Sequence, residues 1–413
     1  MRVDADMEML FILAIVCFTW PLIWLLVISI RYRELIAACW KEPVLKNPVL
    51  IFESDDWGPG AEDDALQLKS IADLLNKYKD DQGRQPVMTL GVVIAVPDSK
   101  KIKAADYKSY YRETLADEKF VSILKAMFDG MGAGVFTAQL HGMEHYWPDN
   151  LIRALTTSDQ LKSLLDSDTP LRTESLPDTL QSRWLETGFE GGHAPTTRDI
   201  ARAVEEEVSA FTSLFGQVAK VIVPPTFVWS EQQELSWYSS GLKHLVTPGF
   251  IATGRDKHGV MGVSKKNIYN GMRAGSGLTY MVRNNYFEPA LGHTVGQAMA
   301  ALTENTLLGR PTLLETHRFN FCDDEAQSQC SLAKLEECLE QAQVDHPALR
   351  FISTSELGDM YLDPTSASSL IDLRVAKRLQ VFIARVWACD VLKKWLYISG
   401  IFILVKILLV SRK

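Results

Sequence analysis

Cysteine is scarce in this chain, and its spacing fits neither a disulfide framework nor a zinc knot. There are six cysteines in 413 residues, and no two of them form a CxxC pair. Cys322, Cys330 and Cys338 are each eight residues apart, whereas structural zinc sites and small disulfide-rich domains use paired or dense spacings. We therefore expect mostly free thiols, with a bond between Cys322 and Cys330 as the open alternative.

The chain also lacks an excess of basic residues, internal repeats and low-complexity tracts. It has 43 Lys and Arg against 51 Asp and Glu, a formal net charge of −8. This mild acidity offers no electrostatic footprint for nucleic acid, so we expect no nucleic-acid partner. With 47% hydrophobic and 23% charged residues, the chain is a folded protein with a sizeable core.

Charged residues are absent from a long apolar run near the N-terminus. Residues 9–30 are long enough to span a bilayer as a helix. No small-x-small cleavage site follows them, which favours a retained transmembrane helix over a cleaved signal peptide. More basic residues follow this run than precede it, so the positive-inside rule places the middle domain on the cytoplasmic side of the membrane.

The C-terminal region contains a second apolar run. Residues 395–410 are shorter than the first run and are interrupted by Lys406, which fits either a second transmembrane helix or an interfacial helix. Residues 370–394 mix basic and apolar side chains and resemble a basic amphipathic helix on anionic lipid. An ordinary solvated helix packed on the domain is the alternative. We expect membrane attachment by the N-terminal helix and by this C-terminal region.

Residues 47–360 have the pattern of one α/β domain. Short apolar runs alternate with stretches of helical period, such as 199–215, 294–308 and 331–343. The expected strands are 49–52, 87–96, 134–140, 220–224, 244–248, 279–283, 311–316 and 349–354. This alternation predicts a mainly parallel sheet, either a complete or an incomplete (β/α) barrel of about seven strands. Residues 146–198 contain no clear strand and predict an insertion near the mouth of the barrel.

Acids and histidines stand at the ends of several expected strands. "FESDDWG" (52–58) puts Asp55 and Asp56 after the first strand, "LHGMEHY" puts His141 and His145 after the third, and "LLETHRF" puts His317 after the strand at 311–316. The carboxyl ends of parallel strands share one mouth, so these side chains should gather there. The acids alone would also suit a solvated turn or a helix N-cap.

Two imidazoles spaced four residues apart on a helical turn face the same side and are a common pair of metal ligands. Together with one carboxylate they would hold a divalent metal: zinc, cobalt, nickel, manganese or iron. The other carboxylate and a further histidine would then act as base and acid in splitting a polarised carbonyl. A buried, hydrogen-bonded histidine pair is the structural alternative.

Taken in order, these segments resemble the polysaccharide deacetylases with a NodB-type homology domain. The family's motifs are similar to "SDDWG", "HGMEH", "VPPTF", "LLETHRF" and the closing "FISTSEL", over residues 48–358 or so. The resemblance implies a distorted (β/α) barrel and a divalent metal, zinc before the others. It also implies hydrolysis of N- or O-acetyl groups on a carbohydrate or glycolipid of the cell envelope.

Matching positions assign the roles. By this resemblance, Asp55 would be the general base and His317 the acid that protonates the leaving group. Asp56, His141 and His145 would bind the metal.

Further residues would line the substrate. The resemblance implies that a backbone N–H after the diproline, such as that of Thr226 beside Pro225, stabilises the oxyanion. Trp57 is a candidate for stacking on a sugar ring, and His193 in the insertion is a candidate for the substrate cleft. One departure matters, because Val223 stands where the family has an arginine that orients the catalytic acid.

Two other functions stay open at this stage. The missing arginine favours a catalytically weak or inactive barrel that binds or assembles carbohydrate at a membrane, whereas the intact acids and histidines favour catalysis. A glycoside hydrolase on a related barrel would instead need two carboxylates that flank a glycosidic bond.

Overall fold

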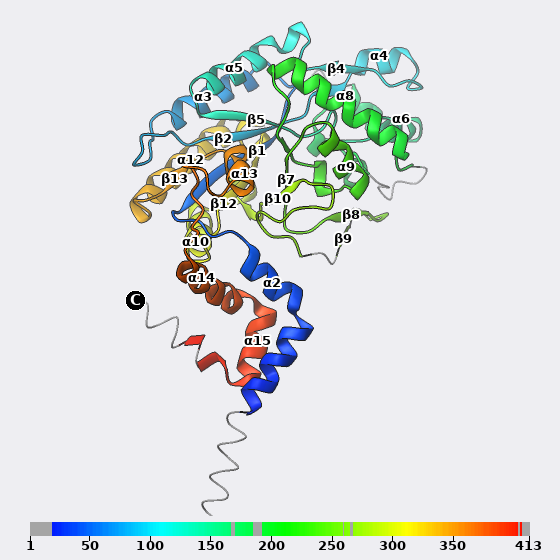
Figure 1. The fold of residues 1–413 in the computed structure, drawn as a ribbon. Helices are drawn as coiled ribbons and strands as arrows, with labels where there is room; N and C mark the ends of the chain where they lie inside the picture. Colours follow the sequence, from blue (N-terminus) through cyan, green and yellow to red (C-terminus); the bar gives the residue numbers. More distant parts are fainter. Residues whose placement is uncertain are drawn as a thin grey trace, which may run out of the picture.

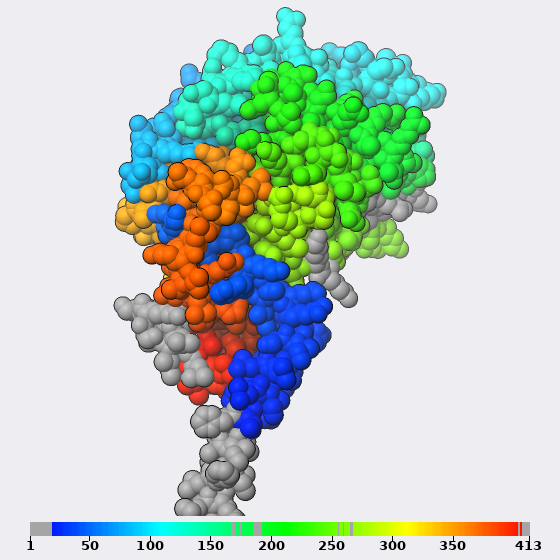
Figure 2. All heavy atoms as spheres, viewed as in Figure 1, coloured from blue at the N-terminus to red at the C-terminus, as the bar shows by residue number. Residues whose placement is uncertain are grey.

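The computed structural model describes residues 19–166, 170–184, 192–258, 260–264, 267–403 and 405–406. The described chain has two parts, an α/β body and a smaller group of helices beside it (Figure 1). We call the smaller group the helical stalk, made of residues 19–42 and 373–403. Figure 2 shows that the stalk is built from both ends of the chain, drawn in blue and red, which lie side by side.

The expected strands form one parallel sheet. They are β1 (Val49–Trp57), β2 (Met88–Val92), β5 (Phe136–Leu140), β6 (Val221–Ile222), β7 (His244–Thr247), β10 (Thr279–Val282), β12 (Thr312–His317) and β13 (Arg350–Phe351). A further short strand, β11 (Asn285–Tyr286), joins the sheet. The nine strands follow the order β10-β7-β6-β5-β2-β1-β12-β11, with β13 beside β1, and every pair in this sheet is parallel.

This strand order is that of a barrel with one open seam. The first strand lies beside the late strand β12, so the sheet curls back on its own start. Among the described strands, β10 and β11 are the two ends of the hydrogen-bonded path, and only Arg283 and Asn284 separate them in the chain. The predicted α/β barrel is therefore present in its incomplete form.

Helices connect the strands and cover the sheet. They are α3 (Asp64–Leu75), α4 (Ser99–Ala104), α5 (Val121–Gly132), α6 (Pro148–Thr157), α7 (Asp159–Leu165), α8 (Thr197–Phe215), α9 (Glu231–Ser239), α10 (Val295–Leu307), α11 (Phe319–Cys322), α12 (Glu325–Asp345) and α13 (Thr354–Leu362). Neighbouring helices pack in a row, since α3 contacts α5 and α12, and α12 contacts α10. Two hairpins, β3 (Ala95–Pro97) with β4 (Arg112–Thr114) and β8 (Ala252–Arg255) with β9 (Met261–Val263), were not predicted.

Local sequence explains where the main helices begin. α8, α10 and α13 each start with a capping box, in which Thr196, Thr294 and Ser353 exchange hydrogen bonds with the residue three positions later. Such boxes satisfy backbone N–H groups that the first helical turn leaves unpaired. The three helices predicted from their helical period are confirmed, and most of their ends differ from the predicted ends by a few residues.

The interior of the barrel is layered along the strands. On β1 the side chains of Val49 and Ile51 belong to a buried apolar cluster with residues of β6, β7, β10 and β12, such as Leu313. Two positions further on, the same face of β1 carries Glu53, and then Asp55, both buried. The lower layer of the barrel is thus apolar and the upper layer, at the carboxyl ends of the strands, is charged.

Two local expectations were wrong. The segment with the two histidines, residues 141–147, is a series of bends rather than a helical turn, because Gly142 has a φ of +95° and the helix α6 begins only at Pro148. The apolar C-terminal stretch is not one helix either. Its first part belongs to α15 (Asp390–Ser399), which ends where Gly400 has a φ of +76°.

The rest of the stalk consists of helical residues 19–31, α2 (Arg33–Lys41) and α14 (Val375–Ala388). Within the described residues, no helix has both the length and the apolar composition that crossing a bilayer requires. Residues 1–18, with the first half of the 9–30 run, lie outside the described residues, as do 404 and 407–410 of the C-terminal run.

The cysteines in the described part of the chain are free thiols: Cys39, Cys322, Cys330, Cys338 and Cys389. The expectation of mostly free thiols is confirmed for them, and the alternative bond between Cys322 and Cys330 is not formed.

Candidate active site

A distortion in β1 brings both adjacent acids to the mouth of the barrel. Asp55 continues the inward-facing row of the strand, so Asp56 would face outward in a regular strand. However, Asp56 has a φ of +67°, and the pairing of β1 with β2 shifts register between Ser54 and Trp57. The strand does not stop before the acids, as a turn would require; it bulges, and the bulge redirects Asp56.

The neighbouring strand leaves room for Asp55. A Cβ atom at Gly91 of β2 would lie 2.2 Å from Asp55 Oδ1. No side chain fits at this position without displacing the carboxylate, so the glycine is part of the site's construction.

Three of the predicted ligands converge on one point. His141 Nε2 and His145 Nε2 lie 3.4 Å and 3.7 Å from Asp56 Oδ1. On the other side of each ring, His141 Nδ1 donates to the carbonyl of Val223 at 2.8 Å and His145 Nδ1 donates to the carbonyl of Gln181 at 2.6 Å. Because a carbonyl oxygen only accepts, these bonds fix the protons on Nδ1 and leave both Nε2 lone pairs facing the carboxylate.

These three side chains fit a divalent metal ion. Asp56 Oδ1 is buried and has no hydrogen-bond partner, and the three candidate ligand atoms lie within 4.8 Å of one another. An unpartnered buried carboxylate oxygen is costly unless a cation meets it. Two imidazole nitrogens and one carboxylate oxygen form the mixed set that zinc and its first-row neighbours accept, with positions left open.

Burial and mutual charges shift the pKa values of all three groups. Burial alone would raise the pKa of Asp56, but the adjacent imidazoles hold it well below its usual value. Burial lowers the pKa of His145 to about 4, which keeps its Nε2 unprotonated. For His141 burial is outweighed by the charges of Asp55 and Asp56, which raise its pKa.

Beside the ligand group, a buried arginine holds the second acid. The Arg283 guanidinium lies 2.6 Å from Asp55 Oδ2, 3.1 Å from Glu53 Oε2 and 3.2 Å from Glu315 Oε2. Burial raises the pKa of Glu53 and of Glu315. For Asp55 the effect of burial is outweighed by Arg283, which holds its pKa below the usual value. Asp55 is thus a carboxylate at neutral pH, and its Oδ1 is buried without a hydrogen-bond partner.

Arg283 supplies a buried arginine beside Asp55, although Val223 stands at the position where the family has its arginine. Val223 is buried and offers the site its backbone carbonyl, so it cannot replace the expected arginine. Arg283 provides the positive charge from a different strand end, directly after β10. Sequence reasoning missed it, together with Glu53 and Glu315. The signal was available, since all three lie at or near the carboxyl ends of expected strands, where the acids and histidines were found.

His317 stands across the mouth from the metal-type group. Its Nδ1 donates to Glu288 Oε1 at 2.6 Å, and its ring stacks on Phe319 with 5.7 Å between centroids. Burial would lower the pKa of His317, but Glu288 raises it to about 10. His317, Asp55 and Glu315 place a nitrogen or oxygen atom each within 4.8 Å of one another. Glu288 is a fourth residue that the motifs did not reveal.

The side chains surround a cavity of about 220 Å³. It is lined by Asp55, Asp56, His141, His145, Thr173, Gln181, Pro224, Thr226, Phe227, Arg283, Glu315, His317 and Phe319. The insertion predicted near the mouth contributes Thr173 and Gln181. The five charged or ionisable residues expected to meet therefore do meet, although their roles stay predictions.

Of the other predicted site residues, some line the cavity and some do not. Thr226 lines the cavity with a φ of +53°, and its hydroxyl donates to the Pro225 carbonyl at 2.7 Å and accepts from Ser182 Oγ at 2.8 Å. Pro225 itself is buried beside the cavity and does not line it. Trp57 is 0% exposed and donates to Ser54 Oγ, so it packs in the core and cannot stack on a sugar there. His193 is exposed and lies outside the cavity lining.

A buried ion-pair network ties the insertion to the histidines. Arg183 Nη1 lies 2.5 Å from Glu144 Oε2, and its Nε lies 3.5 Å from Glu207 Oε2. Glu144 stands between the two histidines in sequence, and Arg183 follows Gln181 and Ser182. The network therefore fixes the segment whose carbonyl orients His145.

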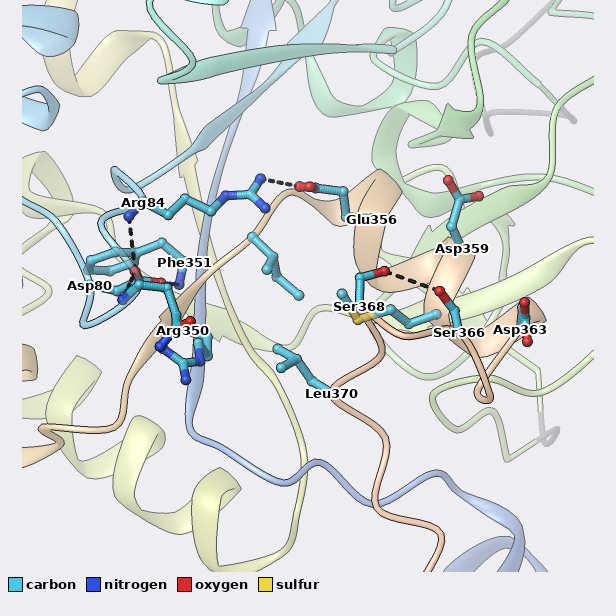
Figure 3. A pocket seen from close by; sticks show the side chains of 13 residues that line it. Asp80, Arg84, Arg350, Phe351, Glu356, Asp359, Asp363, Ser366, Ser368 and Leu370 are labelled. Carbon is cyan, nitrogen blue, oxygen red and sulfur yellow. Dashed lines mark hydrogen bonds and ion pairs between the residues drawn. The ribbon is translucent and has the colours of Figure 1, made fainter.

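A larger hollow of about 590 Å³ lies at the opposite end of β1, where β13 pairs with Val49 and Leu50. Figure 3 shows Arg84 pointing toward Glu356 in this hollow, and the two side chains form an ion pair. Asp359, also in its lining, is bound by Lys220 and His244. It contains none of the predicted site residues, most of which line the smaller cavity instead.

No family model and no curated protein sequence matches this chain. The structure search returns, among others, the peptidoglycan deacetylase PdaC from Bacillus subtilis, with 8% identity and a TM-score of 0.34, over 78% of this chain and 94% of that chain. It also returns a family 4 acetyl xylan esterase from Clostridium thermocellum in complex with a cobalt ion, with 11% identity and a TM-score of 0.35, over 76% and 91% of the two chains.

A 4-alpha-glucanotransferase from Thermococcus litoralis is similar at 10% identity and a TM-score of 0.39, over 78% of this chain. This chain spans only 41% of that protein's length. The search thus returns deacetylases of the kind that the motifs resemble. Similarity at this level carries no argument about activity, which has to come from the site.

Proposed function

We propose that this protein is a metal-dependent hydrolase that removes acetyl groups from a carbohydrate. The observation that carries the proposal is the arrangement around Asp56. Its buried, unpartnered Oδ1 faces two imidazole lone pairs, within one cavity that also contains Asp55 and His317.

The residues present assign a role to each part of the site. Asp56, His141 and His145 would hold the metal, with zinc as our first expectation. Once bound, the metal would polarise the acetyl carbonyl and acidify a water. The free Oδ1 of Asp55 would take a proton from that water as it attacks the carbonyl carbon, while Arg283 keeps the carboxylate ionised and oriented.

His317 would complete the reaction. Its pKa, raised to about 10 by Glu288, keeps the imidazole protonated at neutral pH. It would donate its Nε2 proton to the departing amine or alkoxide oxygen as the carbon–nitrogen or carbon–oxygen bond breaks. The backbone N–H of Thr226, at the strained diproline turn, is our candidate donor to the oxyanion.

The cavity size suits this assignment. About 220 Å³ is below the usual range of roughly 300–1,000 Å³ for pockets that enclose a whole small ligand. It would admit an acetyl group and part of one sugar ring, with the rest of the substrate outside. Phe227 and Phe319 replace Trp57 as the aromatic candidates that could contact the ring.

The test is metal content and acetate release for the purified full chain and two histidine variants. We expect about one divalent ion per wild-type chain and acetate release from acetylated oligosaccharides. His141→Ala should lose both. His193→Ala, an exposed histidine outside the cavity, is the matched control and should retain both.

Other outcomes identify the rival functions. Equal metal content in wild type and His141→Ala would remove the metal assignment. Metal binding without acetate release would indicate a binding protein, the alternative that the Val223 departure favours. Release of reducing ends without acetate would indicate a glycoside hydrolase.

A further inference from the structure

The helical stalk exposes an unusual amount of apolar surface at its free end. Seven large apolar side chains between positions 20 and 30 are each 43–68% exposed: Trp20, Leu22, Ile23, Leu25, Leu26, Val27 and Ile30. On the partner segment, Tyr397, Ile398 and Ile403 are 46%, 51% and 55% exposed. Trp20 Nε1 donates to the Ile398 carbonyl, so the two segments form one surface, which we call the apolar tip. Single exposed apolar residues are ordinary, but a cluster of this size indicates a partner.

Next to the tip lies a belt of aromatic and basic residues. Trp24 and Tyr32 pack on Trp395, which donates to the Tyr32 hydroxyl at 2.8 Å. Arg31 lies over the ring of Tyr32 at 5.3 Å, and Lys393 lies over that of Trp387 at 5.3 Å. Tryptophan, tyrosine, lysine and arginine are the residues that favour the boundary between lipid and water.

Contacts along the stalk place this belt between the tip and the barrel. Trp20 meets Ile398 at the free end, Trp24 meets Trp395 further along, and Cys39 packs near Leu392. At the base, Arg385 binds backbone carbonyls of residues 39–43 and 308–309. Residues 31–33 and 393–394, which carry four basic side chains, therefore lie at the level of Trp24 and Trp395 or closer to the barrel.

The charge of the stalk differs from that of the whole chain. Residues 19–42 and 373–403 contain nine basic and three acidic side chains, in a protein whose net charge is −8. A positive surface around an apolar tip complements an anionic lipid headgroup layer. It does not suit a second copy of the same stalk, since two such belts would repel each other.

We propose that the apolar tip inserts into a lipid bilayer, with the basic and aromatic belt at the headgroups. Helical residues 19–30 supply about 16 Å of apolar length, roughly half of a 30 Å hydrocarbon core. In the sequence, the uncharged apolar run continues from residue 18 back to residue 9. The chain that precedes the tip is therefore compatible with the same lipid environment.

This placement directs the cavity away from the membrane. The stalk base contacts residues just ahead of β1 and β12, since Arg385 of α14 donates to the carbonyls of Pro43, Leu308 and Gly309. Asp55 and His317 are at the opposite ends of these two strands. β1 rises about 20 Å between Val49 and Asp55. If the protein is the deacetylase proposed above, its substrate is a soluble or extended glycan. The first sugar of a glycolipid in the same bilayer would not reach the cavity.

Vesicle flotation of the full chain tests the surface without using activity. Wild type should float with phosphatidylcholine vesicles, and its affinity for the vesicles should increase when phosphatidylglycerol is added. Leu22→Asp with Leu26→Asp should weaken flotation by at least about tenfold, because two carboxylates would enter the hydrocarbon. Leu66→Asp with Val344→Asp, 62% and 76% exposed on the barrel helices α3 and α12, is the matched control and should float like wild type.

Two further measurements separate the alternatives. Lys393→Glu with Lys394→Glu should remove most of the gain from phosphatidylglycerol, about fivefold per side chain. If the tip variant floats as well as wild type, or if it only dissociates dimers in sedimentation while wild type binds no vesicles, the lipid surface is refuted.

The orientation is tested with two acetylated substrates. Vesicle-bound enzyme should release acetate from a soluble oligosaccharide as fast as the tip variant does, and should not act on a glycolipid with one acetylated sugar in the same vesicles. Preferential action on that glycolipid would overturn the orientation. Failure on every substrate would contradict the proposed function and leave the flotation result intact.

Discussion

The two adjacent acids of β1 differ in the origin of the positive charge that they meet. Asp55 faces Arg283, a cation that the chain itself buries beside it. Asp56 faces two imidazoles whose lone pairs point at it, and its Oδ1 has no partner. The comparison teaches that the chain itself supplies the partner of Asp55, whereas Asp56 is arranged with the two histidines as a group of candidate metal ligands. Variants that treat the two acids differently can test this division.

The largest effect should come from neutralising each acid in turn. Asp55→Asn should lower kcat by about 10²–10⁴, the range for loss of a general base, while the bound metal stays. Asp56→Asn should abolish activity through loss of the metal. Metal content measured beside acetate release separates the two. Metal loss in Asp55→Asn with retention in Asp56→Asn would reverse the assignment.

Next in size is the loss of the internal cation. Arg283→Met would leave Glu53, Asp55 and Glu315 buried without their partner, and should lower the free energy of unfolding by about 3–5 kcal/mol. The exposed Arg153 on α6 is the control, since Arg153→Met should cost less than about 0.5 kcal/mol. Urea unfolding measures both.

The same variant has a pH signature. Arg283 lowers the folded-state pKa of Asp55, so its stabilisation is present above the unfolded pKa and is lost as the pH falls through the lower folded pKa. Without Arg283 the pKa of Asp55 rises, and the acidic limb of the kcat profile should move to higher pH. An unmoved acidic limb would contradict Asp55 as the base.

A smaller effect is expected from the partner of His317. Glu288→Gln removes the charge that raises the pKa of His317 to about 10. Because the pKa then falls, the imidazole loses its proton at lower pH, and the alkaline limb of the kcat profile should shift downward. A pH–rate series on both proteins measures the shift. An alkaline limb that stays in place would mean that His317 is not the acid.

The smallest effect should come from the contact between the insertion and the diproline turn. Ser182→Ala removes one hydrogen bond to the Thr226 hydroxyl and should reduce kcat/KM by about two- to tenfold, since one such bond is worth roughly 0.5–1.5 kcal/mol. Ser163→Ala, whose hydroxyl bonds the Asp159 carbonyl on the exposed side of α7, should leave kcat/KM unchanged. Equal kcat/KM in Ser182→Ala and wild type would show that this contact does not contribute to catalysis.

Much of the fold could be predicted because the strands have apolar, β-branched runs and the helices between them a clear period. The convergence of Asp55, His141 and His317 also followed from one rule, that parallel strands end at a shared mouth. The bulge at Asp56 could not be predicted, since a positive φ at a non-glycine residue is imposed by its surroundings.

The missed residues have a different cause. The positions of Arg283, Glu53 and Glu315 near strand ends could be read from the sequence, but sequence alone does not show that one buried arginine pairs with both glutamates. Trp57 was misplaced because an aromatic beside a motif is as readily core as surface. Glu288 precedes a short 3₁₀ turn, a place that no periodic signal marks.

The open seam between β10 and β11 has a consequence for the motions of the barrel. The strands on either side of it each have one edge outside the main hydrogen-bonded path, and local unfolding begins where few such bonds hold the backbone. Amide hydrogens near residues 279–286 should therefore exchange with deuterium before those of β1 and β2. Arg283 lies inside this stretch, so each opening of the seam would briefly separate it from Asp55. The fraction of time for which the site is correctly assembled would then depend on how fast this seam closes.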